Sequence, residues 1–216
     1  GSEMCIRDRL WFGWFGFNGA SYFAAKGAGF SFLTTTLSAS AALLTWCLIE
    51  WFRDGKPTAV GAATGAVAGL VGITPAAGFV YMPQALIIGV ATAAGCYLAV
   101  TIKSAIKFDD SLDAYAVHGV GGTIGALLTG ALAAPALVPA DYFPKSAEIL
   151  ANGGNAALFV AHIKAVLISY GFVGIGTAII LWIVGAVVGL RVTPEEEERG
   201  LDFVAHGEEA YDPMTY

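Results

Sequence analysis

The segment DDSLDAYAVHGVGGTIGALLTG, residues 109–130, places His118 inside an apolar, glycine-rich stretch with the length of a membrane-spanning helix. An ionisable side chain at the centre of a bilayer is costly, so it normally faces a pore or a partner. A neutral imidazole both donates and accepts hydrogen bonds, which suits passage of a small polar molecule or a proton. The alternative is a histidine that bonds a carbonyl of a neighbouring helix. Its position inside the span favours a pore-facing role.

An aromatic cluster, WFGWFGFN, occupies residues 11–18. Trp14 and Phe17 lie three residues apart and Ser21 follows four residues later, so the three side chains share one helical face. Aromatic faces attract cations, and a hydroxyl accepts a hydrogen bond from an ammonium-type donor. The alternative, favoured by composition alone, is an aromatic belt at a membrane interface.

Carboxylates cluster at the start of the span that contains His118. Asp109, Asp110 and Asp113 can cap the free amides of a helix N-terminus, and we expect this structural role above all for Asp113. Asp110 could also attract cations at a pore mouth. A further candidate is Thr74, which with Pro75 ends an earlier apolar stretch, because proline stops a helix there.

The elements that position these residues belong to a membrane. The chain has 216 residues, of which 56% are hydrophobic and 13% charged, with 28 glycines. Its mean hydropathy is +0.69, higher than a soluble domain of this length allows. The net charge of −6 comes entirely from residues 191–216, which hold eight acids and two arginines. Nothing resembles a basic nucleic-acid footprint, and the three cysteines lack metal-ligand spacing, so we expect no nucleic acid, metal or cofactor.

The pattern predicts an all-α polytopic membrane protein with about six helices over residues 10–190 and an acidic cytoplasmic tail over residues 191–216. The expected spans are residues 10–25, 29–51, 57–73, 83–106, 112–134 and 156–190, with one long loop at 135–154. We interpret residues 1–9, which are polar, as a non-native or assembly scar. The first span is short, as if its beginning were missing.

Positive charge predicts the orientation. One set of span ends carries most of the basic residues, namely Arg53, Lys56, Lys103, Lys107 and Arg191. This bias places that side and the C-terminus in the cytoplasm. In the tail, Thr193 and Glu196 have the spacing of a capping box for a short helix. That helix could be a solvated end or a partner-binding element.

Five strings together resemble the ammonium transporter (Amt/Mep/Rh) family, bacterial Amt branch. They are GWFGFN at 13–18, IEWFRDGKPT at 49–58, GAVAGLVGITPAAGFV at 65–80, DDSLDAYAVHGVGGTIGALLTG at 109–130 and VGLRVTPEEEERGLDFVAHGEEAY at 188–211. They follow the family order and cover almost everything after Leu10.

The resemblance implies an eleven-helix homotrimer of two inverted five-helix repeats, with a pore in each subunit. This chain resembles the C-terminal half, the second repeat (helices 6–10) plus helix 11 and the tail. By motif position Phe17 is similar to the pore gate, Trp14 to a pore-lining tryptophan, Ser21 to the outer ammonium-recruitment hydroxyl and His118 to the second of the twin pore histidines. Thr74 is similar to a position near the outer pore wall.

The implied function is transport of ammonium/ammonia across the cell (inner) membrane by cation recruitment, deprotonation and histidine-assisted conduction. Family resemblance also implies a possible PII-type regulatory protein at the cytoplasmic face. Helices one to five are absent from the sequence, and half a pore cannot shield a cation from lipid, so we expect little transport by this chain alone.

Three other functions compete with transport. A membrane enzyme lacks support, because we find no HExxH, GxSxG or paired intramembrane acids. An aquaporin-like channel would need two Asn-Pro-Ala-type half-helices, and the sequence has none. An ammonium sensor on the same fold, signalling through the tail, is the stronger alternative.

Overall fold

The computed structural model describes residues 2–21 and 25–208, with side chains over residues 9–21 and 27–208. It divides into two compact units, residues 1–166 and 167–216. All the regular secondary structure of the described residues is helical, as expected. Residue 1, residues 22–24 near the end of the first expected span, and residues 209–216 of the tail lie outside the described residues.

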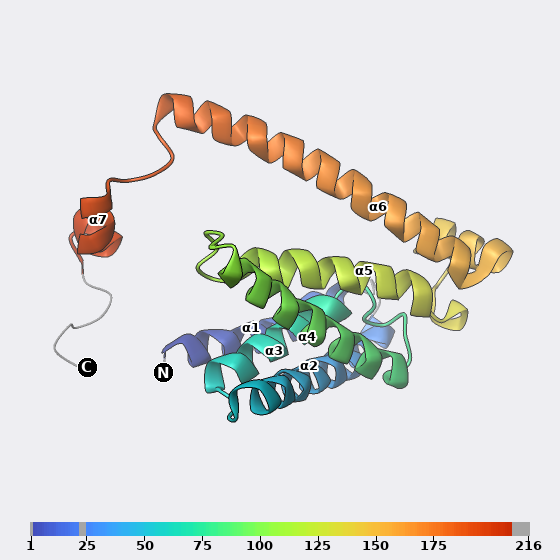
Figure 1. The fold of residues 1–216 in the computed structure, drawn as a ribbon. Helices are drawn as coiled ribbons and strands as arrows, with labels where there is room; N and C mark the ends of the chain where they lie inside the picture. Colours follow the sequence, from blue (N-terminus) through green and yellow to red (C-terminus); the bar gives the residue numbers. More distant parts are fainter. Residues whose placement is uncertain (1, 22–24, 209–216) are drawn as a thin grey trace. The chain divides into compact units, whose positions relative to one another are not determined.

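Five helices form the bundle of the first unit (Figure 1). They are α1 (Ser2–Ser21), α2 (Ala25–Asp54), α3 (Ala59–Ile73), α4 (Met82–Ala105) and α5 (Val120–Leu132), the last preceded by the π-helical turn η1 (Tyr115–Gly119). The helix α3 is the centre of this bundle: it packs against α1, α2, α4, α5 and η1. Its residues from Thr64 to Ile73 are all buried, although the helix has only 15 residues.

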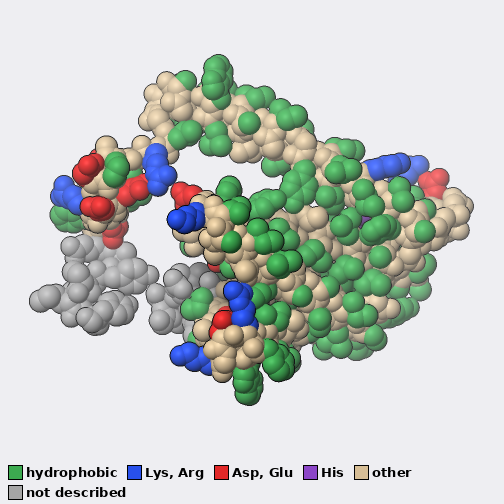
Figure 2. All heavy atoms as spheres, in the orientation of Figure 1, with side chains coloured by type: hydrophobic (Ala, Val, Ile, Leu, Met, Phe, Trp, Pro, Cys, Tyr) green, Lys and Arg blue, Asp and Glu red, His purple; other side chains and the backbone are tan. Residues whose placement is uncertain are grey.

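Four helices in the described part of the chain are long and apolar enough to cross a membrane, over Gly27–Asp54, Met82–Ala105, Tyr115–Leu132 and Pro144–Val187. Hydrophobic side chains lie over much of the face drawn in Figure 2, whereas charged side chains gather in a few small groups. Large side chains such as Phe52 and Leu112 are more than four-fifths exposed, as suits contact with lipid or with further protein. The other two expected spans are not among these four helices: α3 has only 15 residues, which is short for a membrane span, and α1 is the other.

The expected loop at residues 135–154 is wrong over its second half. A short 3-10 turn, η2 (Pro135–Leu137), is followed by α6 (Pro144–Val187), which starts ten residues before Gly154. Gly154 has φ 62° and ψ −163°, so a kink here interrupts α6, and a residue with a side chain would be strained at this φ. Polar residues before Gly154 concealed the first helical turns, although Pro144 at their start is a common first helical residue.

Two polar contacts hold the start of α6 to α5 within the first unit. His162 Nδ1 lies 2.6 Å from the carbonyl oxygen of Ala126, and the Asn155 side chain donates to the carbonyl of Ala133 at 2.8 Å. His162 therefore has the carbonyl contact that we weighed as the alternative for His118.

The second unit contains the rest of α6, then α7 (Pro194–Arg199) and a π-helical turn η3 (Asp202–His206). The predicted capping box is present: Thr193 N donates to Glu196 at 2.9 Å, and Glu196 N donates to the Thr193 hydroxyl at 3.3 Å. Hydrogen bonds from the Thr193 backbone and hydroxyl lower the pKa of Glu196, and the hydrogen bond from Arg191 lowers that of Glu197.

Candidate functional site

Trp14 and Thr74 meet although they lie 60 residues apart in the sequence. The Trp14 indole N–H donates to the Thr74 hydroxyl at 2.7 Å, and that hydroxyl donates to the Leu70 carbonyl at 2.7 Å. Thr74 caps the C-terminus of α3, so the central helix of the bundle presents its hydroxyl to α1. The pair fixes the indole ring against the end of α3.

His118 packs against the same tryptophan. The two ring centroids are 6.3 Å apart and their planes differ by 25°, a stacked arrangement. Within residues 9–21 and 27–208, the structure shows no hydrogen bond to either ring nitrogen of His118, and the side chain is exposed. Both nitrogens are therefore available for hydrogen bonds to a ligand.

The backbone around His118 is irregular. His118 belongs to the π-helical turn η1, and π-helical turns are rare and occur often at functional sites. The Val120 N–H is shared between the carbonyls of Tyr115 and Val117. This wider turn moves His118 away from the position that a regular period of 3.6 residues predicts.

Phe17 and Ser21 extend the site along α1. The Phe17 ring contacts Trp14 edge-on at a centroid distance of 5.8 Å and is 59% exposed. The Ser21 hydroxyl donates to the Phe17 carbonyl at 2.7 Å, one turn earlier on the same helix. The structure therefore brings Trp14, Phe17, Thr74 and His118 together, with Ser21 one turn further along the same face.

Such a site can bind a small cation and handle a proton. The aromatic faces attract positive charge, the hydroxyls accept hydrogen bonds from an N–H donor, and the imidazole accepts or donates a proton. Among the described residues, no group of three or more His, Cys, Asp or Glu side chains could hold a metal ion.

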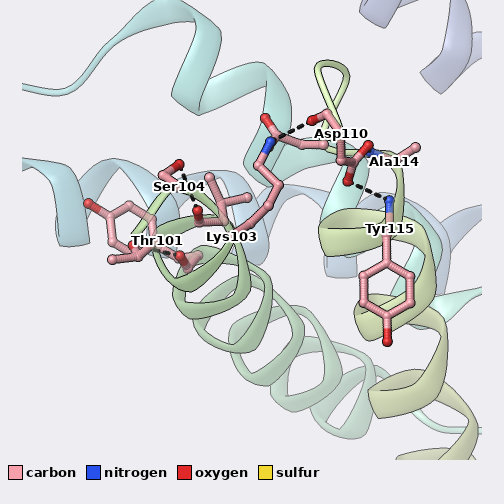
Figure 3. A network of polar contacts seen from close by, with 9 residues as sticks. Thr101, Lys103, Ser104, Asp110, Ala114 and Tyr115 are labelled. Atoms are coloured by element: carbon pink, nitrogen blue, oxygen red, sulfur yellow. Dashed lines mark hydrogen bonds and ion pairs between the residues drawn. The ribbon is translucent and has the colours of Figure 1, made fainter. Parts of the chain in front are cut away.

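The carboxylates of Asp110 and Asp113 have different partners, although Lys103 also donates to the backbone carbonyl of Asp110. Figure 3 shows Asp110 with Lys103, Ala114 and Tyr115. The Asp110 carboxylate accepts the backbone N–H groups of Ala114 at 2.8 Å and Tyr115 at 2.9 Å, so it caps the start of η1. Asp113, for which we expected the capping role, instead forms an ion pair with Lys103 of α4. The reason is its backbone: Asp113 has a positive φ of 55°, which directs the chain into a turn just before the helix starts.

Sequence analysis missed the buried residues that support the site. Asn18, one turn beyond Trp14, is fully buried and donates to the Thr35 hydroxyl at 3.0 Å. Gly125 is a second such residue. A Cβ at Gly125 would lie 2.9 Å from the carbonyl carbon of Gly72, so α5 and α3 meet here as closely as a glycine permits. The spacing of Asn18 from Trp14 was the only signal available.

The fold and site define an all-helical protein of the membrane with a mixed aromatic, hydroxyl and imidazole site. The sequence profile described as the Ammonium Transporter Family matches residues 9–211. The chain belongs to the ammonium transporter family, and it is accordingly a multi-pass membrane protein and a transporter-family member rather than an enzyme.

Individual relatives agree with this assignment. The chain is 43% identical to an ammonium transporter of Bacillus subtilis over 207 residues, 94% of this chain and 49% of the relative. It is 42% identical to the ammonium transporter Amt1 of Archaeoglobus fulgidus, with 94% of this chain and 50% of the relative covered. The chain spans about half the length of the curated relatives it matches.

Solved structures support the fold. The crystal structure of Saccharomyces cerevisiae Mep2 superimposes with a TM-score of 0.73 at 42% identity, covering 88% of this chain and 45% of that chain. A protein described as a Sensor Amt Protein superimposes with a TM-score of 0.80 at 33% identity, covering 94% and 48%.

Proposed function

We propose that this chain is the C-terminal half of a protein that moves ammonium or ammonia across the cell (inner) membrane. The observation that carries the proposal is the convergence of Thr74 and His118, which lie far apart in the sequence, on the Trp14 side chain. Relatives that are named ammonium transporters overlap the chain over about half their length. That overlap and the family order of the motifs support assignment to the second inverted repeat plus helix 11.

The mechanism follows from the energetics of desolvation. A hydrated ammonium ion loses its water when it enters an apolar pore, and burying an unpaired charge is very costly. We propose that Trp14, Phe17 and Ser21 recruit the ion where aromatic faces and a hydroxyl replace part of its hydration shell. The ion then gives a proton to water, which carries it separately, and neutral ammonia passes Thr74 and His118. The ring nitrogens of His118 exchange hydrogen bonds with the ammonia.

The remaining family features are proposals too. We propose a homotrimer with the tail in the cytoplasm, where Asp110 and Asp113 lie at the inner mouth and a PII-type protein can dock. The basic residues Arg53 and Lys103 on the same side of the spans support this orientation. Two reporters fused after Tyr216 test the orientation, one active only in the cytoplasm and one active only outside the cell. We expect activity from the first alone, and activity from the second alone would refute the orientation.

The central experiment compares two substitutions at one position in the complete protein encoded at the native locus. His118→Asp places a fixed negative charge against Trp14, whereas His118→Asn keeps a neutral, hydrogen-bonding side chain. We expect both variants to reduce uptake of labelled methylammonium. In addition, His118→Asp should raise the charge carried per molecule transported. Uptake and current are measured on the same proteoliposomes, with protein abundance matched by immunoblot. Unchanged uptake in both variants would refute a pore role for His118.

The chain alone should transport little. Its exposed apolar and glycine-rich faces need partners that are not part of the sequence, and half a pore leaves the ion open to lipid. Vesicles that contain only this chain test the expectation, and robust methylammonium uptake would overturn it.

The second candidate function is ammonium sensing. It is favoured by the superposition on the Sensor Amt Protein, which has the higher TM-score of the two structures compared above. A sensor would bind ammonium at the Trp14 site and pass the signal to the tail without net flux. Saturable ammonium binding by the purified complete protein, combined with absence of uptake into proteoliposomes, would favour the sensor.

A further inference from the structure

The buried cysteine Cys96 contacts the backbone next to His118. Cys96 lies on α4 with no exposed surface, and its thiol donates to the carbonyl of Val117 at 3.6 Å, the peptide group that joins Val117 to His118. Val117 is itself 4% exposed. The contact is therefore shielded from solvent and links α4 directly to the residue before the histidine.

The π-helical turn makes this contact matter. In η1 the single N–H of Val120 is shared between the Tyr115 and Val117 carbonyls, so each receives only part of a hydrogen bond from it. The Cys96 thiol gives the Val117 carbonyl a second donor from outside the helix. A thiol is a weak donor, but here it acts on a turn whose own hydrogen bonding is divided.

The packing around the thiol leaves little freedom. A Cβ at Gly121 would lie 3.0 Å from the Cys96 sulfur and 3.3 Å from the Thr92 methyl carbon, so α5 approaches α4 as closely as a glycine permits. Trp46, Val67, Ala68 and Val71 form the rest of the buried cluster that holds Cys96 and Val117. The sulfur is held against the Val117 carbonyl by its surroundings and not by chance orientation.

We propose that Cys96 is a positioning residue for His118: its thiol fixes the Val117–His118 peptide group and so the direction of the imidazole against Trp14. The effect of Cys96 on flux rests on the proposed transport function, whereas its effect on the π-helical turn rests on geometry alone. Cysteine as a mere small hydrophobe explains its burial but not the bond to the carbonyl.

The test uses three variants of the complete protein encoded at the native locus. Cys96→Ala removes the donor, Cys96→Ser keeps a donor of similar size, and Cys47→Ala is the matched control. Cys47 is the other free cysteine among the described residues, and it is only partly buried on α2. Two measurements are made on each variant: uptake of labelled methylammonium, and hydrogen exchange of the backbone amides at residues 115–121.

Loss of a weak hydrogen bond of this kind corresponds to a factor of about two to five in an equilibrium. We expect Cys96→Ala to lower uptake and to speed exchange at residues 115–121 by about that factor. Cys96→Ser and Cys47→Ala should stay close to the parent. If uptake falls and exchange speeds up as much in Cys96→Ser as in Cys96→Ala, Cys96 acts through its volume and the proposal is wrong. The proposal is also wrong if Cys96→Ala matches the parent in both measurements.

Failure of the transport function has a different signature. If the parent protein takes up no methylammonium, the proposed function fails, and exchange alone then decides the positioning role. Faster exchange at residues 115–121 in Cys96→Ala, restored in Cys96→Ser, supports the role of Cys96, and equal exchange in all variants refutes it.

Discussion

The contact between α3 and α5 can be broken by one methyl group. Gly125 of α5 lies against the backbone of Gly72 in α3, two residues before Thr74. A Cβ at position 125 would lie 2.9 Å from the Gly72 carbonyl carbon and closer still to its oxygen, whereas carbon atoms in ordinary contact are about 3.5–4.0 Å apart. Gly125→Ala therefore forces the two backbones apart by about 1 Å.

The matched control is Gly95→Ala on α4. A Cβ there would meet only the terminal methyl and neighbouring carbon of the Ile124 side chain, which can rotate away, whereas the Gly72 backbone cannot. Both substitutions gain up to about 1 kcal/mol of helix propensity. Gly125→Ala also incurs overpacking of about 1–3 kcal/mol. The difference in unfolding free energy between the two variants is thus about 1–3 kcal/mol.

Thermal unfolding of the complete protein in detergent measures this difference. For a protein about twice as long as this chain, as the curated relatives are, 1 kcal/mol shifts Tm by about 1–2 °C, so Tm of Gly125→Ala should lie about 1–6 °C below that of Gly95→Ala. Methylammonium uptake at a permissive temperature should fall in Gly125→Ala as well, because the same displacement separates His118 from Trp14. Equal Tm values for the two alanine variants would show that α3 and α5 do not meet at these glycines.

Three further substitutions test the site and the tail. Thr74→Val leaves the Trp14 indole N–H without its acceptor, which costs about 1–3 kcal/mol where the group is shielded. Thr74→Ser keeps the hydroxyl and should restore both stability and uptake. Equal Tm values for the Thr74→Val and Thr74→Ser variants would contradict the pairing. Asp110→Ala removes the acceptor of two backbone N–H groups at the start of η1 and should cost about 0.5–2 kcal/mol, seen as faster hydrogen exchange at residues 114–115, while unchanged exchange would show that the cap is dispensable. The lowered pKa of Glu196 means that its ionised form stabilises α7; this stabilisation is complete above the ordinary carboxyl pKa of 4.5 and is lost as pH falls through the lowered value. Carbon-13 shifts of residues 195–198 should therefore report helix loss on acidification. Glu196→Gln can still bond Thr193 and should reduce the pH dependence, and the part that remains comes from Glu197, whose pKa Arg191 also lowers. A Gln variant that titrates like the parent would refute a contribution from Glu196.

Sequence patterns predicted most of the fold, because membrane helices are recognised by the length and apolarity of their sequences. The expected spans 57–73 and 83–106 agree with α3 (Ala59–Ile73) and α4 (Met82–Ala105) to within two residues at each end. The misassigned loop before Gly154 shows the limit of the method. A short amphipathic or polar helix outside the apolar stretches has no hydropathy signal, and only Pro144 marked its start.

Part of the candidate site was predictable for a different reason. The spacing of Trp14, Phe17 and Ser21 on one helix face depends only on the helical period, and the structure places these residues along one side of α1. The pairing of Trp14 with Thr74 depends on how α1 meets the end of α3, and no local pattern encodes it. The π-helical turn at His118 was equally invisible, because a pattern search assumes the regular period of 3.6 residues.

The position of His118 depends on backbone contacts more than on contacts of its own ring. Its ring has one described neighbour, Trp14, and a stacked pair of this kind contributes only about 0.5–1.5 kcal/mol. The turn that carries it is fixed at three points: Asp110 caps its start, Cys96 bonds the Val117 carbonyl, and Gly125 locks the following helix against α3. If His118 has the proposed role, its ring nitrogens must exchange hydrogen bonds with ammonia, so a permanent hydrogen bond to either nitrogen cannot hold the ring in place. Contacts that fix the backbone around His118 leave both nitrogens open, and we therefore expect sensitive positions to include residues that do not contact the ligand.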